Sequence, residues 1–413
     1  VIEKHQHKVA ATLGAQPDPD SQLTFPGALP GELLAMASQW LPFRRRNFAW
    51  LTSRATSKRG SVDIYCDAVA TGWGVGPGHG EQAHVLAVVA QNAGARRLRV
   101  RAERFVVAAG AIESARILQE IHLAGAGSVI RSGAAVGRCL SDHLSVRIAE
   151  TGPQARRNIV ASCGPRFRNG LMQTWRFVEA DPSPDNRRYF AHLIFPSDGQ
   201  EFQLARAMLQ ALQARRFPVI GARELCTGGA GLLRLAWFRW ARSRLYVAAD
   251  APSHLQMDME QRANASNRVD LGDTVDRYGR PVTRIRWKIS DEDHADLNLA
   301  KSRFLSCWSS VDGTFTEAAP DGNPDMSHKP HNAFHPVGTC RMGNDTEAVV
   351  GYDLGVHGVG NLDVLSTGIF PSSGSANPTF SLLCFAEMLA DSMMGSGGHG
   401  NVRVTERHTP MAN

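Results

Sequence analysis

The sequence predicts a mixed α/β (α+β) fold that combines an open strand–turn–helix layer with a mostly antiparallel sheet flanked by helices. A buried strand at 104–107 runs into a glycine turn, and apolar residues at helical spacing follow over 111–119. Short runs that alternate apolar and polar residues recur within 171–289, and this pattern is typical of antiparallel strands. A second apolar strand, 362–365, ends in a Ser/Gly/Pro turn before another helix.

The composition allows a large core and argues against several classes of protein. The chain has 413 residues, of which 43% are hydrophobic, and this length suggests two or three domains. The net charge of +6 lies in short clusters such as 44–46 without a binding motif, so no nucleic-acid partner is expected. The seven cysteines are widely spaced and include no CxxC pair, which favours free thiols and a cytoplasmic location. Arginines interrupt the apolar stretch 231–247, so a surface helix is favoured there over a helix that lies in a membrane interface.

The first part of the chain carries weaker signals. Residues 31–40 are predicted to form a short helix. Strands are expected at 62–66, 69–71 and 85–89, with the glycine-rich stretch 72–80 between the last two. That stretch lacks GxGxxG spacing and a following amphipathic helix, so a hairpin turn is favoured over a phosphate-binding loop. The strand–glycine–helix at 104–119 is a better candidate, because open α/β sheets present their backbone to nucleotides in this way.

The C-terminal part of the chain concentrates the residues that carry chemistry. His335 lies in a loop, and Asn377 follows it at the start of the last predicted helix. A neutral imidazole can accept the proton of an alcohol O–H, because its reference pKa is near neutrality. An amide can hold the same oxygen without titrating. Neither side chain can accept a hydride, so an oxidation at this site requires an organic cofactor.

Several spaced blocks resemble the C-terminal signature of the glucose–methanol–choline (GMC) flavoprotein oxidoreductases. They are HPVGTCRMG from His335, VHG from Val356, FP from Phe370 and NPT from Asn377. The blocks AAGAIESARIL at 108–118 and VGRCLSDH at 136–143 are similar to further family motifs. The resemblance implies an FAD-dependent oxidoreductase that acts on a small-molecule alcohol, with His335 as the base and Asn377 as the partner of the alcohol oxygen. It leaves the electron acceptor unknown.

The same resemblance places eight residues against FAD: Val69, Ala109, Gly110, Gly137, Ser366, Gly368, Pro378 and Thr379. The chain departs from the family pattern at two positions. Cys139 stands where the family usually has Asn, and Ser366 stands where many members have an acidic residue.

The resemblance also implies a domain order. Residues 1–150 correspond to the remainder of the FAD-binding domain, 151–330 to a substrate-binding domain, 331–395 to a return into the FAD-binding domain, and 396–413 to a tail. The family's N-terminal GxGxxG motif is not found ahead of these blocks, and the literal match at 395–400 lies in the tail. We therefore expect an incomplete FAD-binding Rossmann-like domain whose N-terminal lobe is supplied by a longer reading frame or by another chain. The alternative function is an inactive GMC fragment or an interaction subunit.

Three competing site interpretations are less favoured. His328, His331 and His335 have the spacing of a zinc site, but Pro330 and Pro336 interrupt any helix that would align them, so no metal is expected. The pair Asp142–His143 could be a relay, yet no nucleophile is evident beside it, and a structural turn is favoured. A serine hydrolase is not supported, because no GxSxG sequence occurs.

Overall fold

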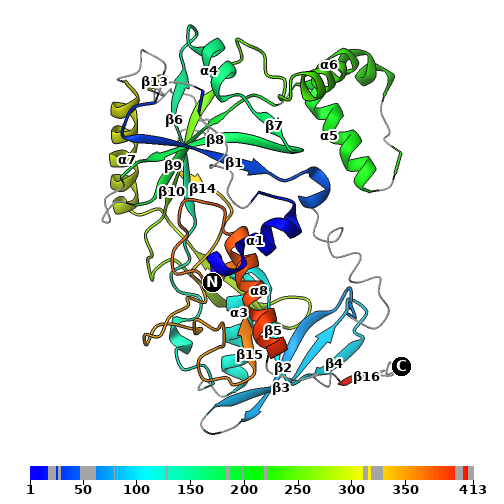
Figure 1. Cartoon of the computed structure of the whole chain (residues 1–413). Coiled ribbons are helices and arrows are strands. Elements are labelled where there is room, and N and C mark those ends of the chain that lie inside the picture. Colours follow the sequence, from blue (N-terminus) through cyan, green and yellow to red (C-terminus); the bar gives the residue numbers. More distant parts are fainter. Residues whose placement is uncertain are drawn as a thin grey trace.

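The structure is a computed structural model, and it divides into two bodies, each built around its own sheet or sheets (Figure 1). It describes residues 1–16, 25–26, 29–46, 62–78, 80, 82–125, 129–181, 187–197, 199–214, 216–217, 221–309, 315–317, 329–395 and 403–407. Among the helices described, none combines the length and the apolar character needed to cross a bilayer.

A large antiparallel sheet forms the first body. Within the described residues its strand order is β1-β8-β9-β10-β6-β13, with β7 paired to β8 and β14 paired to β6. The strands are β1 (Leu33–Trp40), β6 (His143–Thr151), β7 (Arg166–Arg168), β8 (Leu171–Glu179), β9 (Tyr189–Ile194), β10 (His254–Glu260), β13 (Phe315–Glu317) and β14 (His331–Asn332). The predicted antiparallel sheet is therefore confirmed. It also takes in β1, β6 and β14, which begin outside 151–330, so the proposed domain limits remain a prediction.

The predicted helix at 31–40 is wrong, because Leu33–Trp40 is the edge strand β1. It pairs with β8 from Leu33 opposite Glu179 to Trp40 opposite Met172. The segment is rich in Leu, Ala and Met, which rank among the best helix formers, but these propensities differ by less than about 1 kcal/mol per residue. Cross-strand pairing and burial of Leu33 and Ala37 outweigh this local preference.

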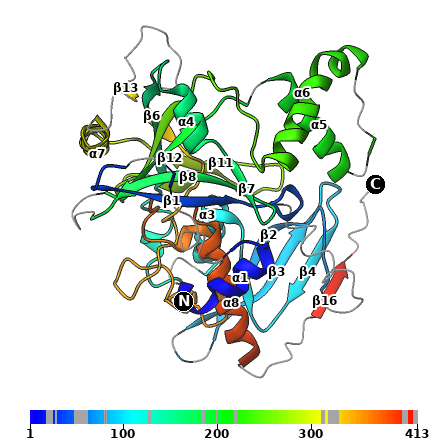
Figure 2. The same ribbon diagram turned by 45° about the horizontal axis from the view of Figure 1, so that its top comes forward.

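One face of the large sheet is covered by α4 (Arg156–Cys163) and α7 (Asp291–Ser309). Phe177 of the sheet and Phe304 of α7 are completely buried in this core, and Trp308 packs against both rings. A reciprocal cap starts α7, since the Asp293 N–H donates to Ser290 Oγ and the Ser290 N–H donates to Asp293 Oδ2. The helical pair α5 (Gln200–Gln213) and α6 (Ala222–Ala241) projects from one end of this body (Figures 1 and 2).

The second body contains the strand–turn–helix layer. Strand β5 (Phe105–Val107) runs parallel to β15 (Leu362–Val364), and α3 (Gly110–Ala124) follows β5 directly. Helix α8 (Thr379–Gly395) lies beside α1 (Ile2–Leu13) in both ribbon views (Figures 1 and 2). The C-terminal segment thus contributes β15 and α8 to this body, and the predicted domain order remains a prediction.

Smaller elements complete this body. They are a sheet of β2 (Val69–Pro77), β3 (Ala83–Gln91), β4 (Arg97–Arg101) and β16 (Arg403–Arg407), a hairpin of β11 (Arg268–Val275) and β12 (Pro281–Arg286), and the short helices η2 (Phe43–Arg46), η3 (Gly133–Ala135) and η5 (Thr367–Ile369). Much of the glycine-rich stretch expected as a turn belongs to strand β2. Register shifts at Ala70/Gly72 and Gly74/Val75 accommodate its glycines, and β3 begins at Ala83.

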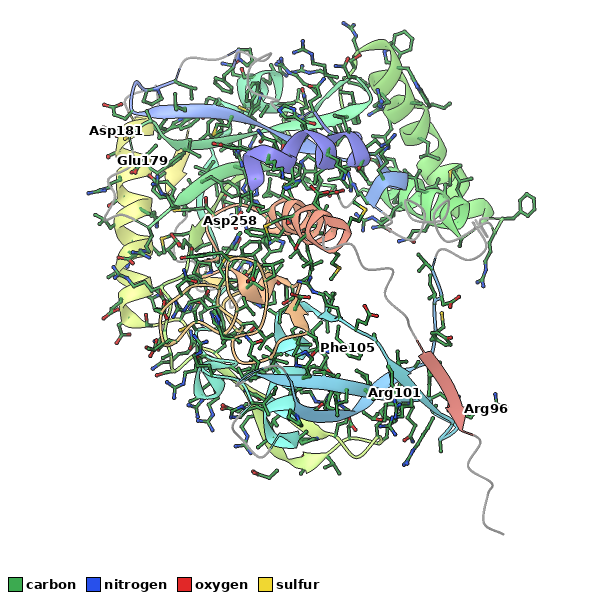
Figure 3. The ribbon with its side chains drawn as sticks, turned by 60° about the horizontal axis from the view of Figure 1, so that its bottom comes forward. Arg96, Arg101, Phe105, Glu179, Asp181 and Asp258 are labelled. Carbon is green, nitrogen blue, oxygen red and sulfur yellow. The ribbon has the colours of Figure 1, made fainter. Side chains whose placement is uncertain are left out.

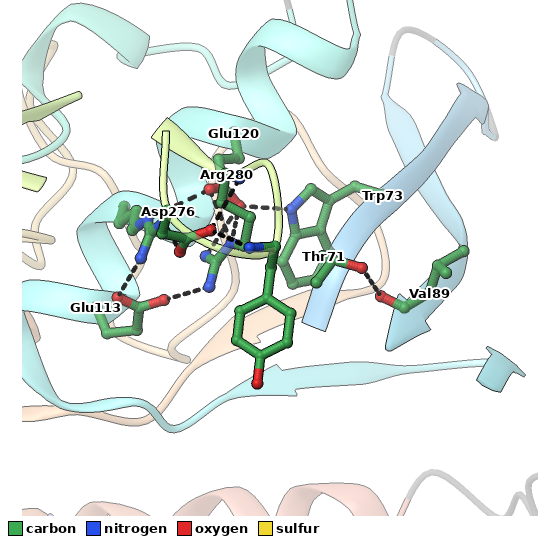
Figure 4. A network of polar contacts seen from close by, with 9 residues as sticks. Thr71, Trp73, Val89, Glu113, Glu120, Asp276 and Arg280 are labelled. Atoms are coloured by element: carbon green, nitrogen blue, oxygen red, sulfur yellow. Dashed lines mark hydrogen bonds and ion pairs between the residues drawn. The ribbon is translucent and has the colours of Figure 1, made fainter. Parts of the chain in front are cut away.

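A polar network fastens the β11–β12 hairpin to α3 and β2 (Figure 4). The buried Arg280 donates to both carboxylate oxygens of Glu120 at 3.0 Å and contacts Glu113 at 2.7 Å. Trp73 Nε1 also donates to Glu120, at 3.0 Å. Because Arg280 and Glu120 are each less than a tenth exposed, this network acts as a structural joint between segments far apart in sequence.

Candidate active site

The loop that carries His335 is held against the start of β6. The His335 N–H donates to both oxygens of the Asp142 carboxylate, at 2.9 and 3.1 Å. The Ala333 N–H donates to the His143 carbonyl at 3.1 Å, and Val337 exchanges backbone hydrogen bonds with Ser141. Between them Phe334 takes a left-handed φ of 61° and is 81% exposed. The loop is therefore fixed on both sides of His335 by backbone contacts.

Asn377 lies in the turn that leads into α8, and its amide faces His335. Asn377 Oδ1 accepts the Thr379 N–H at 3.0 Å, and Asn377 Nδ2 lies 3.1 Å from His335 Nε2. A backbone N–H can only donate, so the Thr379 contact assigns Oδ1 and leaves the NH₂ group toward the imidazole. His335 Nε2 therefore accepts this hydrogen bond and carries a lone pair.

The second ring nitrogen of His335, Nδ1, shows which tautomer the imidazole adopts. His335 Nδ1 is buried and makes no hydrogen bond within the described part of the chain. In a neutral imidazole one nitrogen accepts and the other carries the proton. Since Nε2 accepts from Asn377, the proton belongs on Nδ1. This arrangement gives a neutral base whose lone pair lies beside an amide donor, and such a pair can engage one alcohol O–H.

His143 supports the turn on the other side of His335. Its Nε2–H donates to the Ser373 carbonyl at 2.9 Å, and its ring centroid lies 5.2 Å from that of His335. Burial lowers the pKa of His143, which keeps it neutral near physiological pH. These contacts, together with those of Asp142, are the contacts expected of a structural turn. Sequence reasoning had identified the Asp142–His143 turn but not the Ser373 carbonyl that it holds.

Ala109 and Gly110 lie at the start of α3 with their backbone exposed. Gly110 has a left-handed φ of +75°, and within the described structure nothing beyond its chain neighbours and its own helix backbone lies within 4 Å of the position that a Cβ would take. The Ala109 N–H donates to Ser114 Oγ at 3.3 Å, whereas the first N–H groups of a helix have no partner within it. This end of α3 is therefore an accessible place for an electron-rich cofactor group.

Ser366 and Gly368 form a turn packed against the same end of α3. Ser366 Oγ accepts the Gly368 N–H at 3.2 Å. A Cβ at Gly368 would lie 2.6 Å from Thr339 Oγ1 and 3.3 Å from the Cα of Ala111, so only glycine fits without a shift. Pro378 is buried and Thr379 is exposed at the start of α8. The predicted residues at 109–110 and 366–368 thus meet at the start of α3, whereas 377–379 form the turn that begins α8 beside His335.

Two predicted cofactor residues lie in other surroundings. Val69 begins β2 in the four-stranded sheet. Gly137 is buried with a φ of +87°, and its N–H donates to the Thr339 carbonyl at 2.7 Å. A Cβ there would lie 2.1 Å from the Val269 carbonyl oxygen. Its contacts are those of a close backbone crossing, and its role toward a cofactor remains a prediction.

The histidine spacing does not assemble a metal site in the described residues. No group of three metal-ligating side chains is found among them. His331 contacts the Lys329 carbonyl through Nδ1 at 3.3 Å, and His328 lies outside the described residues.

A family model described as GMC oxidoreductase matches residues 263–386, a range that includes His335 and Asn377. A C-glycoside 3-oxidase from Microbacterium trichothecenolyticum is 32% identical over 125 residues, which make up 30% of this chain and 23% of that protein. An oxygen-dependent choline dehydrogenase from Proteus mirabilis is 39% identical over 70 residues, or 17% of this chain and 13% of that protein. The matched segments thus span less than a quarter of either relative.

A solved structure shares the fold across most of the chain. The pyridoxine 4-oxidase from Mesorbium loti matches with a TM-score of 0.54 at 18% identity, over 87% of this chain and 64% of that one. The predicted mixed α/β architecture is confirmed by this likeness.

Proposed function

Because this chain belongs to the GMC oxidoreductase family, we propose that it is an FAD-dependent oxidoreductase that oxidises the CH–OH group of a small-molecule alcohol. The observation that carries the proposal is the His335–Asn377 pair, with Nε2 and Nδ2 3.1 Å apart. At this separation one oxygen atom can lie within hydrogen-bond distance of both nitrogens. The relatives are named for the oxidation of a glycoside and for choline, which are both hydroxyl compounds.

In the proposed reaction His335 and Asn377 both contact the alcohol oxygen, and each has a different role. Asn377 Nδ2–H donates to the oxygen and orients it. His335 Nε2 accepts the hydroxyl proton as the C–H bond is oxidised, so that the imidazole becomes protonated. The Asp142 carboxylate holds the His335 backbone and thereby keeps Nε2 directed at the same point. His143 fixes the Ser373 turn that precedes Asn377.

Bound FAD would supply the acceptor for the hydride that leaves the alcohol carbon. Ala109 and Gly110 at the α3 N-terminus, Gly368 in the adjoining turn and Thr379 at the start of α8 would hold it. The open space at Gly110 and the exposed N-terminal end of α3 support this assignment.

A second candidate rests on the exposed edge of the parallel layer. In the described residues β5 pairs with β15 on one side only, and Val106 of β5 is 39% exposed. Parallel strands are normally covered on both faces and continued by neighbours. In this second candidate function another polypeptide segment pairs with the exposed edge of β5. The chain is then either one part of a larger enzyme or a non-catalytic interaction subunit.

The test is an absorbance spectrum of the purified chain, recorded before and after addition of FAD and then of a panel of alcohols. The expected result is a bound-flavin band that bleaches with at least one alcohol. A flavin-loaded protein that no alcohol bleaches would overturn the oxidoreductase proposal. A chain that binds no flavin would favour the second candidate.

A further inference from the structure

Helices α5 and α6 form a pair at one end of the first body, clear of the large sheet (Figure 3). Small residues of α6 face α5. A Cβ at Gly228 would lie 3.1 Å from Leu204 Cδ2 of α5, and a Cβ at Gly231 would lie 2.6 Å from the Cβ of Glu201. Glycine at these positions lets the two helices approach closely, so the face of α6 that carries Gly228 and Gly231 is the packed one.

The face of α6 that is turned away from α5 carries large apolar side chains. Leu233, Trp237 and Trp240 follow the i, i+4, i+7 spacing of one helical stripe, and they are 75%, 62% and 78% exposed. These three residues are called the apolar stripe below. Leu212 of α5 and Phe217 beyond it are exposed as well. Single exposed apolar residues are common on proteins, but a row of them on one helix face indicates an interaction surface.

The segment that contains the helical pair is strongly basic. Between residues 202 and 247 the sequence has eight arginines, no lysine and a single acidic residue, Glu224. A second copy of this chain would bring the same positive charge to the apolar stripe, so charge repulsion opposes a dimer through this face. The partner that complements the stripe is therefore an anionic one.

A cationic groove of about 460 Å³ lies at the C-terminal end of α6, where the chain meets β7. Four arginines line it: Arg166, Arg168, Arg242 and Arg244. Within the described residues, Arg166 and Arg244 contact no carboxylate, and both donate to the Ala161 carbonyl near the end of α4. This carbonyl and the dipole of α4 offset only part of two full charges, so the groove keeps a positive potential.

The apolar stripe and the cationic groove are held in one orientation. The Phe167 N–H of β7 donates to the Ser243 carbonyl at 2.7 Å. Arg239 lies over the Phe167 ring, with its guanidinium carbon 3.8 Å from the ring centroid. These contacts fix the C-terminal end of α6 to β7. Trp240 of the stripe lies two positions before Arg242 of the groove, so the apolar and the cationic surfaces adjoin.

We propose that the α5–α6 pair docks on the surface of an anionic lipid bilayer. The apolar stripe enters the boundary between headgroups and acyl chains, where tryptophan is favoured because it combines an apolar ring with a polar N–H. The arginines of the groove bind lipid phosphates at the level of the headgroups. The stripe covers one side of α6, and no described helix is apolar enough to span a bilayer, so α6 lies in the interface.

The proposal takes the arrangement that the sequence alone favours less for residues 231–247. Arginines interrupt the apolar stretch in sequence, but the structure separates the exposed stripe from the groove at its end. This arrangement of apolar and cationic surfaces is the one that an interfacial helix requires. The proposal does not depend on the oxidation proposed at His335.

The test sediments the purified chain with vesicles of phosphatidylcholine alone and with vesicles of phosphatidylcholine mixed with phosphatidylglycerol. Binding is expected to the mixed vesicles only. High salt should release the protein, because it screens the attraction between arginines and anionic lipids. Brominated lipid in the mixed vesicles should quench part of the tryptophan emission, since the indole rings of the apolar stripe then lie beside the acyl chains.

Two variants test the apolar and the cationic surface separately. Leu233→Gln is expected to lower the partition coefficient by about 10-fold, because one apolar side chain no longer leaves water. Arg242→Gln is expected to lower it by about 5-fold, the usual contribution of one arginine at an anionic surface. The matched controls are Leu123→Gln on α3 and Arg303→Gln on α7, which are exposed positions outside the helical pair, and neither should change the coefficient.

Absence of binding to either kind of vesicle would overturn the inference. Binding to mixed vesicles that neither Leu233→Gln nor Arg242→Gln weakens would also overturn it, because another surface would then make the contact. Sedimentation velocity without lipid tests the remaining occupant. A dimer that Leu233→Gln converts to a monomer, without vesicle binding by the unmodified chain, would assign the apolar stripe to a second copy and refute the lipid proposal.

Discussion

Asn377 turns its NH₂ group toward His335 because the Thr379 N–H occupies its oxygen. The Nδ2–Nε2 distance is 3.1 Å, and the Thr379 contact is 3.0 Å. The start of α8 therefore does more than position Asn377. It selects the amide orientation and, through it, the His335 tautomer with a lone pair on Nε2. The tautomer of the candidate base is thus selected by a backbone N–H two residues beyond Asn377.

The first prediction concerns His335 itself. His335→Ala removes the proton acceptor and is expected to lower kcat by roughly two to four orders of magnitude, the usual contribution of a general base. The matched control is His294→Ala, at an exposed position on α7. Steady-state oxidation of the best alcohol measures both variants, with bound flavin quantified by absorbance. Near-normal turnover of flavin-loaded His335→Ala would refute the assignment.

The second prediction concerns the amide donor beside His335. Asn377→Asp replaces the NH₂ group with a carboxylate oxygen, so the alcohol oxygen loses its hydrogen-bond donor and meets a lone pair instead. Turnover is expected to fall by about 10- to 100-fold, the usual effect of losing one such hydrogen bond. Steady-state oxidation measures this change, with bound flavin quantified by absorbance. Near-normal turnover of flavin-loaded Asn377→Asp would show that Asn377 does not hold the alcohol oxygen.

The His335–Asn377 pair could be predicted from the sequence, through residue chemistry together with the resemblance to the GMC family. His335 and Asn377 stand 42 positions apart, and their pairing follows from a loop, a strand and a helix start that the local pattern indicates. Asp142 could not be assigned in the same way. Its carboxylate contacts the His335 backbone from 193 positions upstream, and such a contact depends on how β6 and β14 pair.

Strand register explains the remaining differences. The helix expected at 31–40 is β1, because its partner β8 lies far along the chain and outweighs the local preference. Ser145 of β6 and His192 of β9 both lie against Asp258 of β10, and none of the three segments alone shows that these residues meet. Alternation predicts which face a residue occupies, whereas only the register predicts its neighbours.

The third prediction concerns the joint in Figure 4. Arg280→Met leaves the Glu120 carboxylate without its bidentate partner in a buried setting, so the free energy of unfolding should fall by roughly 3–5 kcal/mol. The control, Arg284→Met, breaks a solvent-exposed pair with Asp273 on the same hairpin and should cost about 0–1 kcal/mol. Urea unfolding followed by circular dichroism compares the two.

Adding Glu120→Gln to Arg280→Met should restore part of the lost stability, because the buried carboxylate that keeps only Arg116, at 3.4 Å, as a cationic partner is then neutralised. Equal losses for Arg280→Met and Arg284→Met would contradict the structural role of the joint.

The last prediction concerns His254 at the start of β10. Burial, and secondly the positive charge of Arg147, lower its pKa from the reference value of 6.5 to about 4. Above pH 6.5 the imidazole is neutral in both the folded and the unfolded chain. Between pH 6.5 and 4 the unfolded chain binds the proton first, so protonation favours unfolding and stability falls with falling pH.

His254→Gln removes this titrating group, so the melting temperature of the variant should decline less steeply over that pH window than that of the unmodified protein. His294→Gln, at the exposed position on α7, should keep the original slope. Thermal melts at half-unit pH steps distinguish the cases, and identical slopes for all three proteins would show that His254 is not buried as described.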